Sequence, residues 1–189
     1  MQPYAKSFLI AAVLLTSLGL WAQEAYHFRD PSLLARFSYD TSPIVQGEGL
    51  RHICIAVSRD GDYRTVRFLD GGPTQRLRGK IQEQQLQQLR KLISDSDFRV
   101  LSGSHGGIIR REAENFGAEI LREDGTQRLH WLNGDGENPF PDSVAKVVNW
   151  LKRFEPTDAK SFEYAEYPDV CPRGGLRLLQ PSVAANLRP

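Results

Sequence analysis

The sequence has no excess of either charge, and this excludes one large class of partners. Lys and Arg number 24 against 23 Asp and Glu. A chain so close to neutral lacks the positive field that drives nucleic-acid binding. It also lacks a polybasic segment for anionic membrane surfaces. We therefore expect no nucleic-acid partner.

Familiar catalytic motifs are also missing. The chain has no Walker loop, no dinucleotide-binding fingerprint, no C-x-x-C pair and no G-x-S-x-G elbow. Its 4 histidines form no H-E-x-x-H or other close-spaced ligand pair. His52 and His130 are interpreted as ordinary strand residues, although the strand order decides whether they meet near Glu119. The sequence thus predicts no cofactor, no metal site and no enzymatic activity.

The one long apolar run lies at the N-terminus and is typical of a secretory signal. Lys6 is the only charged residue before Glu24, and the apolar run Phe8–Leu20 follows it. This run is shorter than the roughly 20 residues that a membrane-spanning helix needs. Because Ala22 offers a cleavage point, we predict a signal peptide over residues 1–22 and export to the periplasm or the exterior. An uncleaved anchor is the alternative; after cleavage we expect no stable membrane insertion.

Cysteine is scarce, with Cys54 and Cys171 only. An even number of cysteines in an exported chain favours a disulfide, because the compartment is oxidising. Two separate buried thiols are the alternative. A Cys54–Cys171 bridge would hold the proline-rich C-terminal tail against the rest of the chain.

Two hairpins, each followed by an amphipathic helix, organise the middle of the chain. Asp60-Gly61 and Asp124-Gly125 are turn signals, since such pairs tolerate the positive φ of tight turns. Apolar residues alternate on both sides of each turn, which predicts strands. Helical spacing of apolar residues predicts helices over about residues 82–94 and 142–154.

These elements predict an α+β fold in a ββα–ββα plan. An antiparallel four- to five-stranded sheet with two helices on one face buries both apolar stripes. The domain is expected over residues 50–154, between an N-terminal lead-in over 23–49 and an irregular C-terminal tail over 155–189. Within the lead-in, residues 32–37 are expected to form a short helix, because Pro31 suits the first helical position.

Strand alternation assigns side chains to the two faces of this sheet. The residues expected to face the helices are Ile53, Ile55, Val57, Val66, Phe68, Phe116, Ile120, Leu129 and Trp131. Those expected on the opposite face are His52, Cys54, Ser58, Thr65, Arg67, Asn115, Glu119, Arg128 and His130. Phe162, Tyr164 and Tyr167 of the tail are expected to cover part of that opposite face.

Two loops carry the candidate binding residues, which are Ser104, His105, Asp135 and Glu137. The first loop, residues 102–107, combines a serine and a histidine with flexible glycines. The second loop, residues 133–141, is rich in oxygen-bearing side chains. Its spacing does not match a calcium loop, because Asn138 stands where an EF-hand requires glycine.

The stretch Ile53–Phe154 resembles emfourin, a proteinaceous inhibitor of thermolysin-type metallopeptidases, and related small bacterial domains. The residues that carry the resemblance are Leu86-x2-Leu89-x2-Leu92, Asp97-Phe98, Phe116-x-Ala118-x-Ile120, Asp124-Gly125, His130 and Val144-x2-Val147-Val148-x-Trp150-Leu151. The N-terminal segment and the cysteine-bearing tail are additions to the emfourin plan. No functional residue is carried over from the family.

The expected function is therefore that of an exported, non-catalytic binding protein. The resemblance implies inhibition of a thermolysin-type peptidase, with a peptidase or an envelope protein as partner. The alternatives are a structural or interaction domain of the cell envelope and a hydrolase that uses the His105 loop. The sequence leaves the oligomeric state open.

Overall fold

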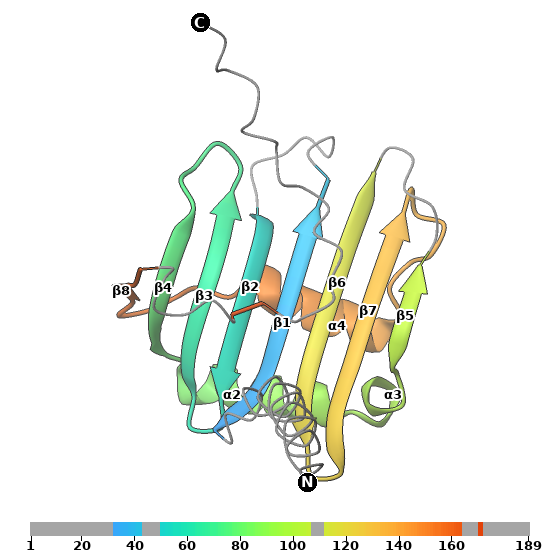
Figure 1. Cartoon of the computed structure of the whole chain (residues 1–189), viewed down its shortest axis with the longest axis horizontal. Coiled ribbons are helices and arrows are strands. Elements are labelled where there is room, and N and C mark those ends of the chain that lie inside the picture. Colours follow the sequence, from blue (N-terminus) through green and yellow to red (C-terminus); the bar gives the residue numbers. More distant parts are fainter. Residues whose placement is uncertain (1–31, 43–49, 107–111, 164–169, 172–189) are drawn as a thin grey trace, which may run out of the picture. The chain divides into compact units, whose positions relative to one another are not determined.

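The described part of the chain is built around one sheet of eight strands (Figure 1). A computed structural model describes residues 32–42, 50–106, 112–163 and 170–171. The chain divides into two units, Met1–Pro31 and Ser32–Pro189, and every described residue belongs to the second. The predicted signal peptide, residues 1–22, lies outside the described residues.

The strands follow the order β5-β7-β6-β1-β2-β3-β4-β8 across the sheet. In chain order the elements are β1 (Leu33–Thr41), β2 (Leu50–Ser58), β3 (Asp62–Leu69), β4 (Gln75–Lys80), α2 (Glu83–Ser94), α3 (Ser96–Arg99), β5 (Gly103–Gly106), β6 (Ala113–Arg122), β7 (Gly125–Gly134), α4 (Asp142–Lys152) and β8 (Lys160–Ser161). All neighbouring strands are antiparallel except β5 and β7, which run parallel.

The α+β class and both predicted helices are confirmed, but the predicted sheet is wrong. Within the described residues the sheet has eight strands rather than four or five and is mixed rather than antiparallel, and a short helix, α3, is present in addition to the two long ones. The two predicted hairpins, β2–β3 and β6–β7, are present but are not adjacent. Strand β1 lies between them and pairs with β2 on one side and β6 on the other.

Strand β1 is the largest departure from the sequence-based expectation, because part of it was expected to be a short helix. Ala35, Phe37 and Tyr39 alternate along the strand and are all buried on the helix-bearing side of the sheet. A helix would turn Phe37 away from Ala35 and Tyr39, whereas a strand places all three side chains on one face. Tertiary pairing on both sides of β1 thus overrides the helix-start signal at Pro31.

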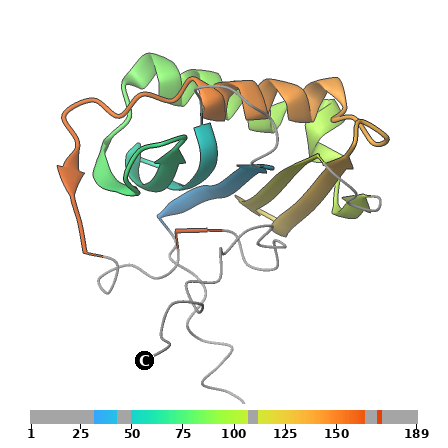
Figure 2. The same ribbon diagram turned by 90° about the horizontal axis from the view of Figure 1, so that it is seen from above.

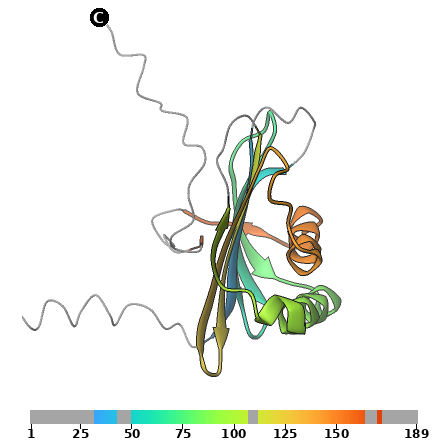
Figure 3. The ribbon, with the colours of Figure 1, turned by 90° about the vertical axis from the view of Figure 1, so that its right-hand side faces the viewer.

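The helices cover one face of the sheet, as Figures 2 and 3 show. Leu86, Leu89 and Ile93 of α2 pack there together with the apolar stripe of α4. The predicted core residues Ile53, Ile55, Val57, Phe116, Ile120 and Leu129 are buried in the same cluster, and Trp131 packs against it. Each such side chain stabilises the fold by about 1.5–3 kcal/mol through its burial.

The predicted faces of β3 are reversed. Val66 pairs with Cys54 and therefore lies on the face away from the helices, as does Phe68, which is 36% exposed. Thr65 instead points into the core, where its hydroxyl donates to the carbonyl of Cys54 at 2.9 Å. Arg67 also lies on the helix face, and its guanidinium donates to the Phe154 carbonyl at 3.4 Å. The hydrogen bonds let both polar residues occupy positions expected to be apolar.

A second, smaller apolar cluster lies on the face of the sheet opposite the helices. Its buried members are Cys54, Phe162 and Val170, with Ala56, Val66 and Cys171 packed against them. The expected cover by Phe162 is confirmed, whereas Tyr164 and Tyr167 lie outside the described residues. The tail also extends the sheet, because Lys160–Ser161 form β8 against β4.

Candidate functional site

Ser104 and His105 lie on edge strand β5 rather than in an irregular loop. His105 pairs with Trp131 and stacks on its indole, with ring centroids 4.5 Å apart. Its Nε2 is 2.8 Å from the carbonyl oxygen of Ser102. Ser104 points to the opposite face, because consecutive residues of a strand alternate. The two side chains therefore do not form a nucleophile–base pair.

The loop between β7 and α4 is held in a defined conformation by hydrogen bonds at its base. The Asp135 amide donates to the carbonyl of Glu112 at 2.8 Å, and the Glu112 amide donates back to Asp135 Oδ1 at 2.8 Å. Asp135 has φ of 51° and Gly136 of 76°, values in the left-handed region that aspartate and glycine tolerate best. Residues 135–137 at the tip are exposed.

Further contacts fix the second half of this loop. The indole of Trp131 donates to the carbonyl of Asn138 at 3.1 Å, and the Asn138 side chain donates to the carbonyl of Leu132 at 3.3 Å. Phe140 packs edge-on against Phe116 of the core, with ring centroids 6.4 Å apart. The loop is thus anchored at both ends and exposed at its tip, where Asp135 and Glu137 lie.

The structure brings the two predicted binding regions to one corner of the sheet. Strand β5 runs parallel to β7, so both strands end at the same edge (Figure 1). Gly106 at the end of β5 is paired with Leu132, directly before the β7–α4 loop. A Cβ on Gly106 would come within 2.7 Å of the Leu132 Cβ, so this close approach requires glycine.

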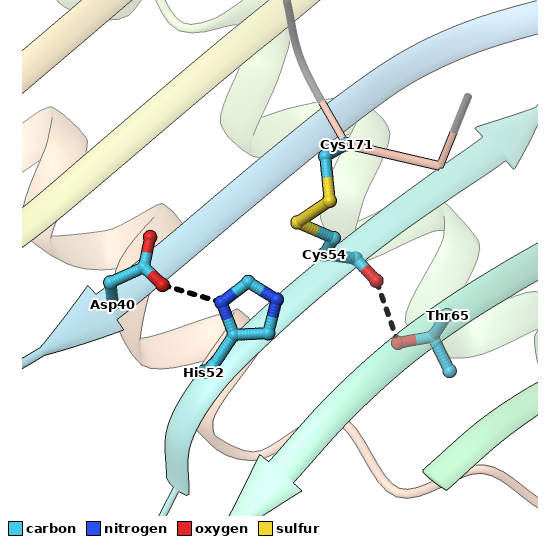
Figure 4. The surroundings of a disulfide bond; sticks show 5 residues. All are labelled: Asp40, His52, Cys54, Thr65 and Cys171. Carbon is cyan, nitrogen blue, oxygen red and sulfur yellow. Dashed lines mark hydrogen bonds and ion pairs between the residues drawn. A yellow bond between two sulfur atoms is a disulfide. The ribbon is translucent and has the colours of Figure 1, made fainter. Parts of the chain in front are cut away.

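The predicted Cys54–Cys171 disulfide is present on the face opposite the helices (Figure 4). Its Cα atoms are 4.9 Å apart, well within the range for bridging. Cys54 is 1% exposed and belongs to the second apolar cluster. The bond joins β2 to a tail residue 117 positions further along the chain.

His52 and Asp40 lie beside this disulfide, as Figure 4 shows. His52 and Cys54 are two residues apart on β2 and so share a face. Asp40 is the cross-strand partner of His52 on β1, and its carboxylate is hydrogen-bonded to His52 Nδ1. A ligand atom of His52 and the sulfurs of Cys54 and Cys171 all lie within 4.8 Å of one another.

The sequence-based reading missed this group for an identifiable reason. Asp40 lies in the segment that was assigned to the lead-in, so it had no place beside β2. The alternation of the apolar residues Ala35, Phe37 and Tyr39 predicts a strand, and a strand would place Asp40 on the opposite face from them. The idea that His52 and His130 meet is wrong, because β1 and β6 separate their strands. Three strand spacings of about 4.8 Å lie between them.

A cluster of ionisable groups joins α4 to the sheet. The Tyr39 hydroxyl donates to Glu114 at 2.6 Å, and the Lys152 ammonium donates to Glu114 at 3.2 Å. Burial raises the pKa of Glu114, but these two partners outweigh it and hold that pKa below its usual value. Burial, followed by the bond to Glu114, raises the pKa of Tyr39 far above its usual value. These contacts connect α4 to β1 and β6, so we interpret the cluster as one that stabilises the fold.

Comparison with known proteins finds no matching family model, no matching curated protein and no matching solved structure. Among the described residues, no helix has the combination of length and apolar character needed to cross a membrane.

Proposed function

We propose that this chain is an exported, non-catalytic binding protein whose contact surface is the corner formed by β5 and the β7–α4 loop. The observation that supports this most strongly is the anchored loop, residues 135–141, with its exposed acidic tip. A loop that is already ordered loses little conformational freedom when a partner binds, and more of the contact energy then appears as affinity.

The surroundings of His105 favour binding over hydrolysis. A hydrolase that used this imidazole would need a nucleophile within hydrogen-bond distance of it. Among the described residues, the contacts of His105 are the Trp131 ring and the Ser102 carbonyl. Neither group can act as a nucleophile, and Ser104 lies on the other side of the strand. The pairing of β5 with β7 accounts for the position of His105, and no catalytic role is needed to explain it.

Export is the second part of the proposal. The N-terminal pattern of Lys6, the apolar run Phe8–Leu20 and Ala22 favours a cleaved signal peptide. The Cys54–Cys171 disulfide fits the same conclusion, because such bonds persist in oxidising compartments. We place the protein in the periplasm or outside the cell.

The partner that we propose is a secreted thermolysin-type peptidase, and this rests on the resemblance of Ile53–Phe154 to emfourin. The near-neutral charge of the chain is compatible with a protein partner. A structural or interaction domain of the cell envelope is the second candidate. The same corner of the molecule would serve either role.

Calorimetric titration of the exported chain against such a peptidase tests the proposal. Asp135→Ala removes the acceptor for the Glu112 amide and places a less tolerant residue at positive φ, so we expect about tenfold weaker binding, about 1.4 kcal/mol. Asp135→Asn keeps a side-chain oxygen and tolerates this φ, so it separates loop order from charge. Glu137→Gln removes the second tip charge.

The matched control is Asp124→Asn, at the exposed turn at the other end of the β6–β7 hairpin. It should bind like the unmodified chain. If no binding to the peptidase is detected at micromolar concentrations, the peptidase is the wrong partner. If binding occurs but Asp135→Ala and Glu137→Gln leave it unchanged, the loop is the wrong surface.

A further inference from the structure

We propose that the reduced form of this chain binds one Zn²⁺ ion through His52, Cys54 and Cys171, and that the disulfide is the closed, metal-free state of the same site. This site lies on the face opposite the helices and is independent of the proposed binding corner. The three side chains come from only two segments, β2 and the tail residue Cys171.

The spacing of the donor atoms supports the proposal. The two sulfurs and a His52 ring nitrogen all lie within 4.8 Å of one another. Ligands bound to one tetrahedral zinc lie about 2.0–2.3 Å from the ion, and hence about 3.3–3.8 Å from one another. After reduction the two sulfurs, which are bonded to each other in the disulfide, must move apart to this spacing, and the imidazole must come up to about 1 Å nearer to them. Side-chain rotation supplies both movements.

His52 has the hydrogen-bond partner that histidine ligands of zinc commonly have. Its Nδ1 is hydrogen-bonded to the carboxylate of Asp40, which leaves Nε2 for an ion (Figure 4). Histidine ligands of metals usually make such a bond through their other nitrogen, since it fixes the ring and raises its basicity. Asp40 is held opposite His52 by the β1–β2 pairing. Asp40 is thus a positioning residue rather than a ligand.

The chemistry of the donor set selects zinc over the hard cations. Two thiolates and one imidazole suit Zn²⁺ and soft metals such as Cu⁺, whereas Ca²⁺ and Mg²⁺ require oxygen ligands. Two thiolates also neutralise the 2+ charge of zinc, which suits a site where Cys54 is 1% exposed. Three protein ligands leave the fourth position to water.

The change between the two states is a balanced thiol–disulfide exchange. A dithiol reductant gives two electrons and two protons to the Cys54–Cys171 bond, which breaks into two thiols, and the reductant becomes a disulfide. Zinc then displaces the two thiol protons as it binds. Either the disulfide or the ion holds Cys171 against β2, so the tail stays attached in both states.

Cobalt titration of the exported chain tests this site, because Co²⁺ replaces Zn²⁺ and reports thiolate ligands by absorbance. The chain is first reduced with a water-soluble phosphine, which adds no competing thiol. We expect one Co²⁺ per reduced chain, with a thiolate-to-cobalt charge-transfer band, and displacement of the cobalt by Zn²⁺. The disulfide form should give no such band.

Variants assign the ligands in the same assay. His52→Ala should weaken binding at least a hundredfold, and Asp40→Asn tenfold to a hundredfold. The matched control is His130→Ala, a histidine of the same face that lies on β7, and it should bind like the unmodified chain. An unchanged affinity in His52→Ala would overturn the three-ligand site, as would equal binding by the disulfide form.

A second measurement covers the case in which reduction loosens the chain. Trypsin cleavage after Lys160 should be faster in the reduced chain, and Zn²⁺ should slow it to the rate seen with the disulfide. Circular dichroism establishes that the sheet persists under these conditions. No cobalt band at micromolar concentrations, together with no protection by zinc, would show that the proposal is wrong.

Discussion

Removal of the disulfide by Cys171→Ser should lower the free energy of unfolding by several kcal/mol. The bond closes a loop of 117 residues. The loop-closure relation gives about 5 kcal/mol at 25 °C for that length, an upper value because denatured chains are compact. Cys171 is partly exposed, so a serine hydroxyl there reaches water and adds little further cost. We expect a loss of about 3–5 kcal/mol.

Urea unfolding followed by circular dichroism measures this loss, and the slope with denaturant should rise because the unfolded chain is less compact. Cys54→Ser should cost about 1–3 kcal/mol more than Cys171→Ser, because its hydroxyl is buried at a position only 1% exposed. The double variant should resemble Cys54→Ser alone, since the bond can be lost only once. A loss below 1 kcal/mol for Cys171→Ser would show that the disulfide does not stabilise the fold through loop closure.

Three further predictions concern ionisable groups. Glu114 has a pKa held below its usual value, so its stabilising effect is present above about pH 4.5 and is lost as the pH falls. Tyr39→Phe removes one of the hydrogen-bond partners of Glu114. The loss of stability in acid, measured by unfolding at a series of pH values, should therefore be smaller in this variant. Burial lowers the pKa of His130, so the unfolded chain takes up a proton that the folded chain does not. The free energy of unfolding should therefore fall as the pH drops through about 6.5. His130→Gln should abolish this pH dependence. His105→Ala loses the stack on Trp131, so the free energy of unfolding should fall by about 0.5–1.5 kcal/mol in the same urea measurement.

The local elements of this fold could be predicted, whereas their order in the sheet could not. Asp60-Gly61 and Asp124-Gly125 mark the two hairpins, and the apolar spacing of α2 and α4 marks both helices, because turn chemistry and periodicity act within a few residues. The place of β1 depends on pairing with two strands that lie far away in the chain. No local pattern in residues 33–41 indicates that β2 and β6 are the two strands that pair with β1.

In β3 the register set by the turn, and not the pattern of apolar residues, decides which side chains face the helices. Val66 and Phe68 are the apolar residues of the strand, and they suggested the core face. The turn pairs Val57 with Tyr63, so Tyr63 and Thr65 share the face of Val57. Val66 packs on the other face against the second apolar cluster, which includes residues of the tail.

The candidate sites follow the same division between local and long-range information. The disulfide could be predicted because it required only a compartment and an even count of cysteines. The contact of His52 with Asp40 required the position of β1 and was missed. The separation of Ser104 from His105 required the knowledge that residues 103–106 form a strand, since only then do neighbours point apart.

The most direct test of the binding proposal is an activity titration. A secreted thermolysin-type peptidase, at a concentration well above the dissociation constant, is mixed with increasing amounts of the exported chain, and residual hydrolysis is measured. We expect the residual activity to fall linearly and to reach zero at one chain per peptidase, with Asp124→Asn giving the same titration curve. Full peptidase activity at micromolar concentrations of the chain would contradict the inhibitory role.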